Sequence, residues 1–313
     1  MKIPFLKNWG PKDCIGLDLG KGEWKWAKIA RPAPERCKLV FLDSTPAPKD
    51  PDRILEILKE VVSQKNWRNM PVALSFHDDT LHMRKLELPR MPPEDLKEAV
   101  RWQLRDVADG SMDDYAVHFA TLKENMTTDV TRLTLLGYAV KKSVLKELET
   151  LLTKAGLKPF FIEPTPVSLA YTVERLFPTI ENEWIGTVDI GWKRAYFMAI
   201  GQGKLQYVKY LPHVSLEAAQ TLSENYPAQL AVEIQHAIDA FSIGYQIEKI
   251  ERIFLTGGGA ALPNLSERLS QNIGIRTQIL DPFQGLEQAN NFPLAQQKPF
   301  LFGAALGLAF LQP

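Results

Sequence analysis

Cysteine is scarce in this chain of 313 residues, which contains only Cys14 and Cys37. Two cysteines cannot build a disulfide framework, and neither belongs to a C-x-x-C or Cys/His spacing of the kind that binds zinc. An excess of one charge is also missing, because 37 Lys and Arg residues balance 37 Asp and Glu residues. This balance argues against a dedicated nucleic-acid binder and against charge-driven docking on an anionic membrane. The scarcity of cysteine leads us to expect a protein of the reducing cytoplasm.

Long apolar segments are absent as well. The most apolar stretch, Phe300 to Leu311, spans about a dozen residues, whereas a membrane-spanning helix needs about 20. Residues 1–13 hold no apolar stretch of the length that a signal peptide requires. We expect no direct membrane insertion. The length of 313 residues predicts about two domains, or one large domain with an inserted subdomain.

The familiar catalytic and metal-binding patterns do not occur in the sequence. There is no G-x-S-x-G nucleophile elbow and no G-x-x-x-x-G-K-[ST] phosphate loop. No pair of histidines has a zinc-binding spacing, so structural or surface roles are favoured for all of them. These histidines are His77, His82, His118, His213 and His236. The sequence thus predicts no catalytic residue and no metal ligand that we can name.

The order of predicted elements divides the chain into four parts. In residues 1–80, an apolar run and a Gly-rich turn begin a β-hairpin, and a third strand, a helix and a buried strand follow. Residues 81–160 have the pattern of a compact β-α-β-β-α subdomain. Residues 161–296 begin again with a hairpin, and residues 297–313 hold an Ala/Gly/Leu helix that we expect to return to the first part.

A short repeat links the two large parts. Asp18-Leu19-Gly20 in the first hairpin reappears as Asp189-Ile190-Gly191 in the second, and Gly257-Gly258-Gly259 follows a predicted strand. Glycine lets backbone N–H groups approach a phosphate, and an aspartate can hold Mg²⁺ through water. Each motif taken singly is more often an ordinary turn than a ligand site. Their order along the chain is the more specific signal.

This order resembles that of the actin-like ATPases, in which two related halves bind ATP between their hairpin tips. The segment from Leu88 to Gln103 is similar, in addition, to a signature stretch of the PilM family of type IV pilus assembly proteins. Residues 109–120, 255–265 and 302–308 resemble further parts of that family. The resemblance implies a duplicated α/β fold of the actin-like (ribonuclease H-like) type with an inserted α+β subdomain.

The loops that would contact phosphate depart from the family pattern. Residues 21–24 (KGEW) and 192–194 (WKR) stand where small or hydroxyl residues are expected. A glycine pair and a Thr-bearing helix expected beyond Leu211 are missing, so we expect a reduced upper lobe in the second half. These changes favour a degenerate or non-hydrolysing cleft over a working ATP site. If ATP and Mg²⁺ bind, the resemblance implies these neighbours: Asp18, Gly20, Lys21, Gly22, Asp189, Gly191, Gly257, Gly258 and Gly259.

The resemblance also implies a function, that of a cytoplasmic scaffold in the inner-membrane platform of a type IV pilus or related secretion system. The chain would be peripheral to the membrane through a PilN-like bitopic protein, whose short N-terminal tail would lie in a groove between the first half and the inserted subdomain. Other pilus motor components are further candidate partners, and no nucleic acid is expected. The candidate groove residues are Arg84, Leu86, Leu88, Met91 and Trp102.

Two other functions stay open. An ATPase or small-molecule kinase of the actin-like superfamily needs an intact phosphate cleft and an acidic base near the substrate hydroxyl, whereas the loops here are altered. The cytoplasmic region of a type II secretion L-like subunit needs a downstream transmembrane helix, which this sequence does not contain. Binding and turnover of ATP with Mg²⁺ separate the scaffold from the enzyme.

Overall fold

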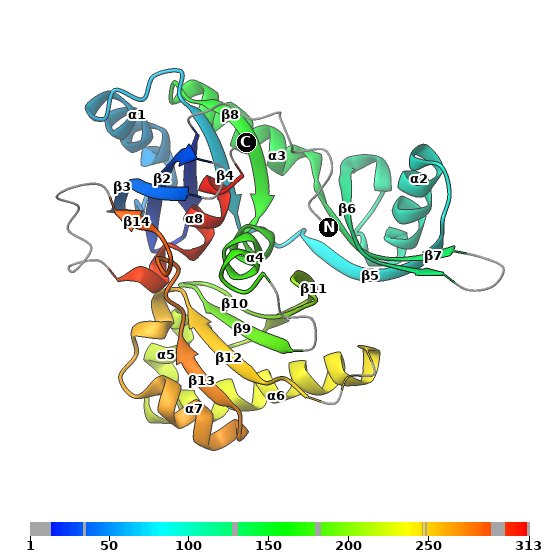
Figure 1. Cartoon of the computed structure of the whole chain (residues 1–313). Helices are drawn as coiled ribbons and strands as arrows, with labels where there is room; N and C mark the ends of the chain where they lie inside the picture. Colours follow the sequence, from blue (N-terminus) through cyan, green and yellow to red (C-terminus); the bar gives the residue numbers. More distant parts are fainter. Residues whose placement is uncertain are drawn as a thin grey trace.

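The computed structural model describes residues 14–33, 36–126, 131–178, 183–245, 247, 249–288 and 298–311. Two β-sheets with helices packed on them form the two halves of the molecule, and a third, smaller sheet projects to one side (Figure 1). Within the described ranges, no helix is both long and apolar enough to span a bilayer. The prediction made for residues 1–13 lies outside these ranges.

The first half is built on a mixed sheet with the strand order β14-β3-β2-β1-β4-β8. The central strand β1 pairs antiparallel with β2 and parallel with β4. Helices α1 (Ile54–Gln64) and α3 (Lys142–Lys154) bury Leu58 and Leu152 against this sheet. The strands are β1 (Ile15–Leu19), β2 (Glu23–Ala33), β3 (Arg36–Pro46), β4 (Pro71–Phe76), β8 (Lys158–Pro164) and β14 (Glu287–Gln288).

The second half repeats this topology, with the strand order β11-β10-β9-β12-β13. Its central strand β9 pairs antiparallel with β10 and parallel with β12, as β1 does with β2 and β4. The predicted duplication is therefore confirmed. The strands are β9 (Trp184–Ile190), β10 (Ala195–Gly201), β11 (Lys204–Leu211), β12 (Arg252–Thr256) and β13 (Arg276–Ile279), and the helices are α5 (Leu216–Leu222), α6 (Tyr226–Tyr245) and α7 (Leu265–Ile273).

The inserted subdomain is a three-stranded antiparallel sheet covered by one helix. Its strand order is β5-β7-β6, and its elements are β5 (His82–Pro89), α2 (Pro93–Gln103), β6 (Tyr115–Met126) and β7 (Thr131–Lys141). Pro at the start of α2 and acidic residues in its first turn favour helix initiation. Leu96 and Val100 of this helix pack on Leu86 and Leu135 of the sheet.

The domain boundary predicted at residue 160 is wrong in two respects. Strand β8 spans that position and pairs parallel with β4 in the first sheet. Helix α3, predicted within the subdomain, packs on the first sheet because its apolar stripe matches the face around Leu58. In addition, β14 pairs with β3 of the first sheet, although it lies in the segment assigned to the second half. The sequence interpretation missed β8, β14 and α4 (Thr165–Leu176).

Two helices join the halves, and their backbones approach one another closely. Helix α8 (Gly303–Ala309) packs on β1 and on α4, and α4 in turn packs on β10 and β11 (Figure 1). A Cβ atom added to Gly307 would overlap the carbonyl group of Ser168, and one added to Gly16 would overlap that of Ala305. The hydroxyl of Thr172 donates to the carbonyl oxygen of Gly303 at 2.7 Å. The C-terminal helix α8 thus lies against strands of the first half.

The inserted subdomain contacts the second half as well as the first. Lys204 Nζ of β11 donates to the carbonyl oxygen of Thr121 at 2.6 Å. The Tyr138 hydroxyl donates to Glu163 Oε2 of β8 at 3.0 Å. Burial raises the pKa of Glu163 to about 7, and the hydrogen bond from Tyr138 opposes only part of this shift. The contact between the inserted subdomain and the first half therefore contains a carboxyl group that titrates near neutral pH.

Replacing Gly307 by alanine should destabilise the protein, because the new methyl group would force α8 away from α4. Overpacking of this kind costs about 1–3 kcal/mol, measured as the free energy of unfolding in urea. Gly244 near the end of α6 is the matched control, since a Cβ atom there has nothing within 4 Å. Gly244→Ala should change stability by less than about 1 kcal/mol, in the stabilising direction. Equal losses in both variants would contradict the close packing of the two helices.

The stability of the wild-type protein should fall as the pH rises from about 5 to 8. An unfolded glutamate titrates near 4.5, whereas Glu163 in the folded chain titrates near 7. Between these values the folded state keeps a proton that the unfolded state releases, so this contribution is lost as the pH rises through 7 and becomes constant above about 8. Glu163→Gln should flatten the profile, and Glu60→Gln on the exposed face of α1 should not. Urea unfolding of the wild type and of both variants at several pH values gives these profiles. Parallel profiles for the wild type and Glu163→Gln would refute the raised pKa of Glu163.

Candidate functional site

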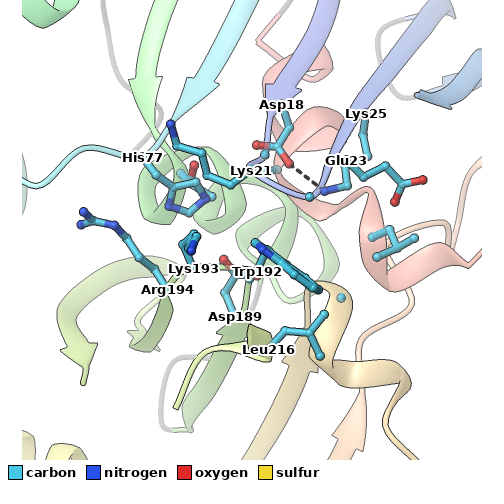
Figure 2. A pocket seen from close by; sticks show the side chains of 18 of the residues that line it. Asp18, Lys21, Glu23, Lys25, His77, Asp189, Trp192, Lys193, Arg194 and Leu216 are labelled. Atoms are coloured by element: carbon cyan, nitrogen blue, oxygen red, sulfur yellow. Dashed lines mark hydrogen bonds and ion pairs between the residues drawn. The ribbon is translucent and has the colours of Figure 1, made fainter. Parts of the chain in front are cut away.

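A cleft of about 660 Å³ lies between the hairpin tips of the two halves. The β1–β2 tip lines one side, the β9–β10 tip lines the other, and the first residues of α4 and α8 line it as well (Figure 2). Eight of the nine predicted nucleotide-site residues line this one cleft. They are Asp18, Gly20, Lys21, Gly22, Asp189, Gly191, Gly257 and Gly258.

Gly259, the ninth predicted residue, does not line the cleft. It is buried, and a Cβ atom added there would overlap the side chain of Ile190. The small size of Gly259 therefore allows the 3-10 turn Gly258–Ala261, which follows β12, to pack against the end of β9. Gly257 has φ +78° and lies so close to Asp189 that an added Cβ atom would be 2.5 Å from Oδ1. Glycine is needed at position 257 for both reasons.

Asp18 lies near the end of β1 and is almost fully buried, with 6% of its surface exposed. Its Oδ2 accepts a hydrogen bond from Lys25 Nζ at 3.5 Å. Its Oδ1 is buried and has no hydrogen-bond partner among the residues that the structure describes. Lys25 also lines the cleft. The sequence interpretation missed it, although its place in the strand opposite Asp18 was a usable signal.

Asp189 is the equivalent residue at the end of β9. Burial raises its pKa to about 7, and the nearby charge of Asp18 acts in the same direction, while Lys25 opposes it. Asp189 is therefore protonated much more readily near neutral pH than an exposed aspartate. Helix α5 holds the tip of the β9–β10 hairpin in place through two backbone hydrogen bonds. The N–H of Leu216 donates to the Gly191 carbonyl oxygen at 2.9 Å, and the N–H of Glu217 donates to the Trp192 carbonyl oxygen at 3.0 Å.

Trp192 lies between the two hairpin tips. A Cβ atom added to Gly22 would lie 3.3 Å from Trp192 Cβ and 3.5 Å from its Cγ, so the indole side chain packs against the first tip (Figure 2). Its neighbours are engaged elsewhere. Lys193 Nζ is 2.6 Å from Glu217 Oε1, and Arg194 forms an ion pair with Asp79. Of the bulky residues noted in the sequence, Trp192 thus occupies the space beside the first loop.

His77 is a further cleft residue that sequence reasoning did not select. It follows β4, lines the cleft, and stacks on Tyr196 at 5.8 Å between ring centroids. Burial lowers its pKa to about 4; the Asp18 carboxylate opposes this shift, and the charges of Lys25, Arg194 and Lys21 add to it. His77 is therefore neutral at physiological pH. No spacing in the sequence distinguished it from the other histidines.

The residues of the cleft do not fit a divalent metal ion well. Mg²⁺ is bound through negatively charged carboxylates and water, but Asp18 is paired with an ammonium group and Asp189 is partly protonated. Across the described residues, no group of three or more His, Cys, Asp or Glu side chains is arranged to hold a metal. The cations Lys21 and Lys25, beside the glycines of the first tip, fit an anionic group better.

The candidate groove residues lie in different environments. Leu86 and Leu88 are buried in the core of the inserted subdomain, so the prediction that they contact a partner is wrong. Met91 packs against the same core. Trp102 is 64% exposed, and the Arg105 guanidinium lies 4.1 Å from its ring centroid. Arg84 Nη1 donates to the carbonyl oxygen of Gln103 at 3.4 Å, which places it beside this end of α2.

Comparisons with known proteins agree with the architecture. Residues 217–312 match the family model described as type IV pilus assembly protein PilM. No curated protein matches the sequence significantly. A solved structure of a PilM-PilN type IV pilus biogenesis complex is similar, with a TM-score of 0.83 and 20% identity over 97% of this chain and 100% of that chain.

Two more distant structures share the fold. One is a protein of Bacteroides thetaiotaomicron with an actin-like ATPase fold and unknown function, with a TM-score of 0.51 and 10% identity over 87% of this chain and 91% of that one. The other is an inorganic polyphosphate/ATP-glucomannokinase from Arthrobacter sp. strain KM, with a TM-score of 0.52 and 16% identity over 96% and 98%. The chain thus has the actin-like ATPase fold, and its part after residue 216 is similar in sequence to PilM.

Proposed function

We propose that this protein is a PilM-like scaffold of a type IV pilus or related inner-membrane assembly platform. It works at the cytoplasmic face of the membrane, where it binds the short N-terminal tail of a PilN-like bitopic protein. The observation that carries this proposal is the similarity of the whole fold, inserted subdomain included, to PilM in a complex with PilN. The family match over residues 217–312 supports it independently from the sequence.

The inserted subdomain offers a suitable surface for such a tail at the C-terminal end of α2. Exposed tryptophan and arginine side chains contribute strongly to protein interfaces, and Trp102, Arg105 and Arg84 lie together here. The stacked guanidinium holds the indole ring in place before binding, which lowers the entropy lost on association. We propose this patch as the part of the subdomain that contacts the tail.

The cleft between the halves supports a scaffold better than an ATPase. Hydrolysis needs a phosphate group held beside a metal ion and a positioned water, whereas Trp192 packs against the first loop and Lys25 is paired with Asp18. We propose that the cleft has lost hydrolysis.

A phosphoryl-transfer enzyme is the second candidate, and one observation favours it. Asp189, whose pKa burial raises to about 7, has the protonation behaviour of a general base.

Substituting Trp102 by alanine should weaken the binding of a synthetic peptide with the sequence of the partner's N-terminal tail. Loss of an interface tryptophan typically costs 2 kcal/mol or more, about 30-fold in Kd. Ile243→Ala is the matched control, since Ile243 is 82% exposed on α6 of the second half. Fluorescence anisotropy measures both affinities. If Trp102→Ala binds as tightly as wild type, the patch is not the tail site; if no neighbouring membrane protein's tail binds at all, the scaffold proposal fails.

Turnover of ATP in the presence of Mg²⁺ should stay at the level of the uncatalysed control, because the loops do not position metal and phosphate together. Release of inorganic phosphate measures this directly. Turnover that is lost in Asp18→Ala and in Asp189→Asn, with the fold retained by circular dichroism, would establish the enzyme instead.

A further inference from the structure

The inserted subdomain packs on the rest of the molecule with the face of its sheet that α2 leaves uncovered. One apolar cluster joins the two sides of this contact, and its members include Leu122 of β6, Leu136 of β7, Val173 of α4 and Leu205 of β11. Tyr138 lies two residues after Leu136 on β7, so its side chain projects from the same face. The chain enters the subdomain from the first half, but the subdomain rests against α4 and the second half (Figure 1). We call this contact the subdomain interface.

One carboxyl group lies beside the subdomain interface on the side of the first half. Glu163, at the end of β8, is 6% exposed, and its Oε2 accepts a hydrogen bond from the Tyr138 hydroxyl at 3.0 Å. It forms no ion pair with any residue that the structure describes. The neighbouring strand β4 has no titratable residue, and His118, stacked on Tyr138, is neutral at neutral pH because burial lowers its pKa. The charged residues of α3, which packs on β8, are all exposed: Lys142, Lys146, Glu147, Glu149 and Lys154.

A second carboxyl group lies on the side of the second half. Glu174 of α4 accepts, through Oε1, a hydrogen bond from the backbone N–H of Leu205 at 2.9 Å. Lys204, the preceding residue of β11, donates from Nζ to the Thr121 carbonyl oxygen of the subdomain at 2.6 Å. The other elements packed on α4 add no charge, because α8 has no titratable residue and the only one of β10 is the buried Tyr196. The contact between β11 and the subdomain thus adjoins this second carboxyl group.

Burial makes the charged form of both carboxyl groups unfavourable, because a buried charge loses its hydration. It raises the pKa of Glu163 to about 7, and the hydrogen bond from the phenol opposes only part of this shift. Burial also raises the pKa of Glu174 to about 7, against the backbone N–H and the nearby ammonium group. Tyr171 of α4 stays neutral, since burial raises its pKa and both carboxyl groups add to the shift. Loss of the two protons therefore favours any arrangement in which water reaches these groups.

We propose that the subdomain interface is a proton-controlled switch, which is closed while Glu163 and Glu174 are protonated and opens when they ionise. Opening lets water solvate the two carboxylates from the side of β6 and β7. It separates the apolar residues of the subdomain from α4 and β11 and breaks the hydrogen bond from Lys204, while each half keeps its own sheet. The switch concerns how the subdomain is held, and it depends neither on the proposed contact at Trp102 nor on a ligand of the cleft.

Double electron–electron resonance between two spin labels measures this opening. Glu98→Cys on α2 and Glu267→Cys on α7 place exposed labels on the subdomain and on the second half. Cys37→Ser removes the partly exposed native thiol, and Cys14 is buried. A carboxyl group that titrates near 7 when closed and near 4.5 when solvated raises the ratio of open to closed molecules about 10-fold between about pH 6 and 8.5, and two raise it about 100-fold. We expect one distance at the lower pH and a second, additional distance at the higher pH.

Glu163→Gln combined with Glu174→Gln keeps both side chains uncharged and should show the closed distance at both pH values. Glu60→Gln on the exposed face of α1 is the control and should behave as the wild type. Tyr138→Phe removes the hydrogen bond that favours the ionised form of Glu163, so the midpoint should move to higher pH. Circular dichroism checks that every variant is folded. Identical distances at both pH values in the labelled wild type overturn the proposal, as does pH-dependent opening that persists in the double glutamine variant.

Discussion

The close contact of α4 with α8 is the constraint on which the rest of the structure depends. Gly307 and Gly16 allow α8 to lie against Ser168 on one side and against β1 on the other. The same two helices line the cleft with Thr165 and Leu169 from α4 and Gly303 and Ala304 from α8. Because packed backbones deform little, the separation of the two hairpin tips is set by this contact before any ligand enters.

The chemistry of the cleft follows from what lies on these fixed tips. Each half presents an aspartate at the end of its central strand, but the two carboxylates have different surroundings. Asp18 is compensated by Lys25 across one strand pair. Asp189 forms no ion pair within the part of the chain that the structure describes, and burial raises its pKa to about 7. The duplication therefore conserves backbone positions and not charge. This asymmetry, together with Trp192 between the tips, distinguishes the cleft from a symmetric phosphate clamp.

Much of the fold could be predicted, because alternation and turn glycines are local signals. The two D-x-G turns located both central strands, and the helix stripe around Leu230 located α6. Strand β8 was missed because Lys158–Pro164 has two prolines and no alternation, and its strand character comes from pairing with β4. Leu86 and Leu88 were assigned to a partner surface because strand residues on a half-buried face look alike until the covering helix is known.

The sequence predicted the glycines, the two aspartates and Lys21 of the site, but not the contacts of Lys25 with Asp18 and of Arg194 with Asp79. Motif spacing identifies residues that are close in sequence, whereas Lys25 meets Asp18 only through the strand pairing, and Arg194 meets Asp79 only across the cleft. His77 comes from a third segment, after β4. None of these partners shares a motif with the residue that it contacts. The charge balance of the cleft is thus a property of the assembled halves.

The inserted subdomain is connected to both sides of this arrangement. Its entry, at Asp78 and Asp79, leaves the first half and is held by Arg194 of the second tip. Its strand β6 is held by Lys204 of β11, also in the second half. The pair with exposed Asp79 contributes at most about 1 kcal/mol, so it can be exchanged without unfolding. Any change in the separation of the halves must therefore break one of these contacts or turn the subdomain, which links the cleft physically to the surface around Trp102.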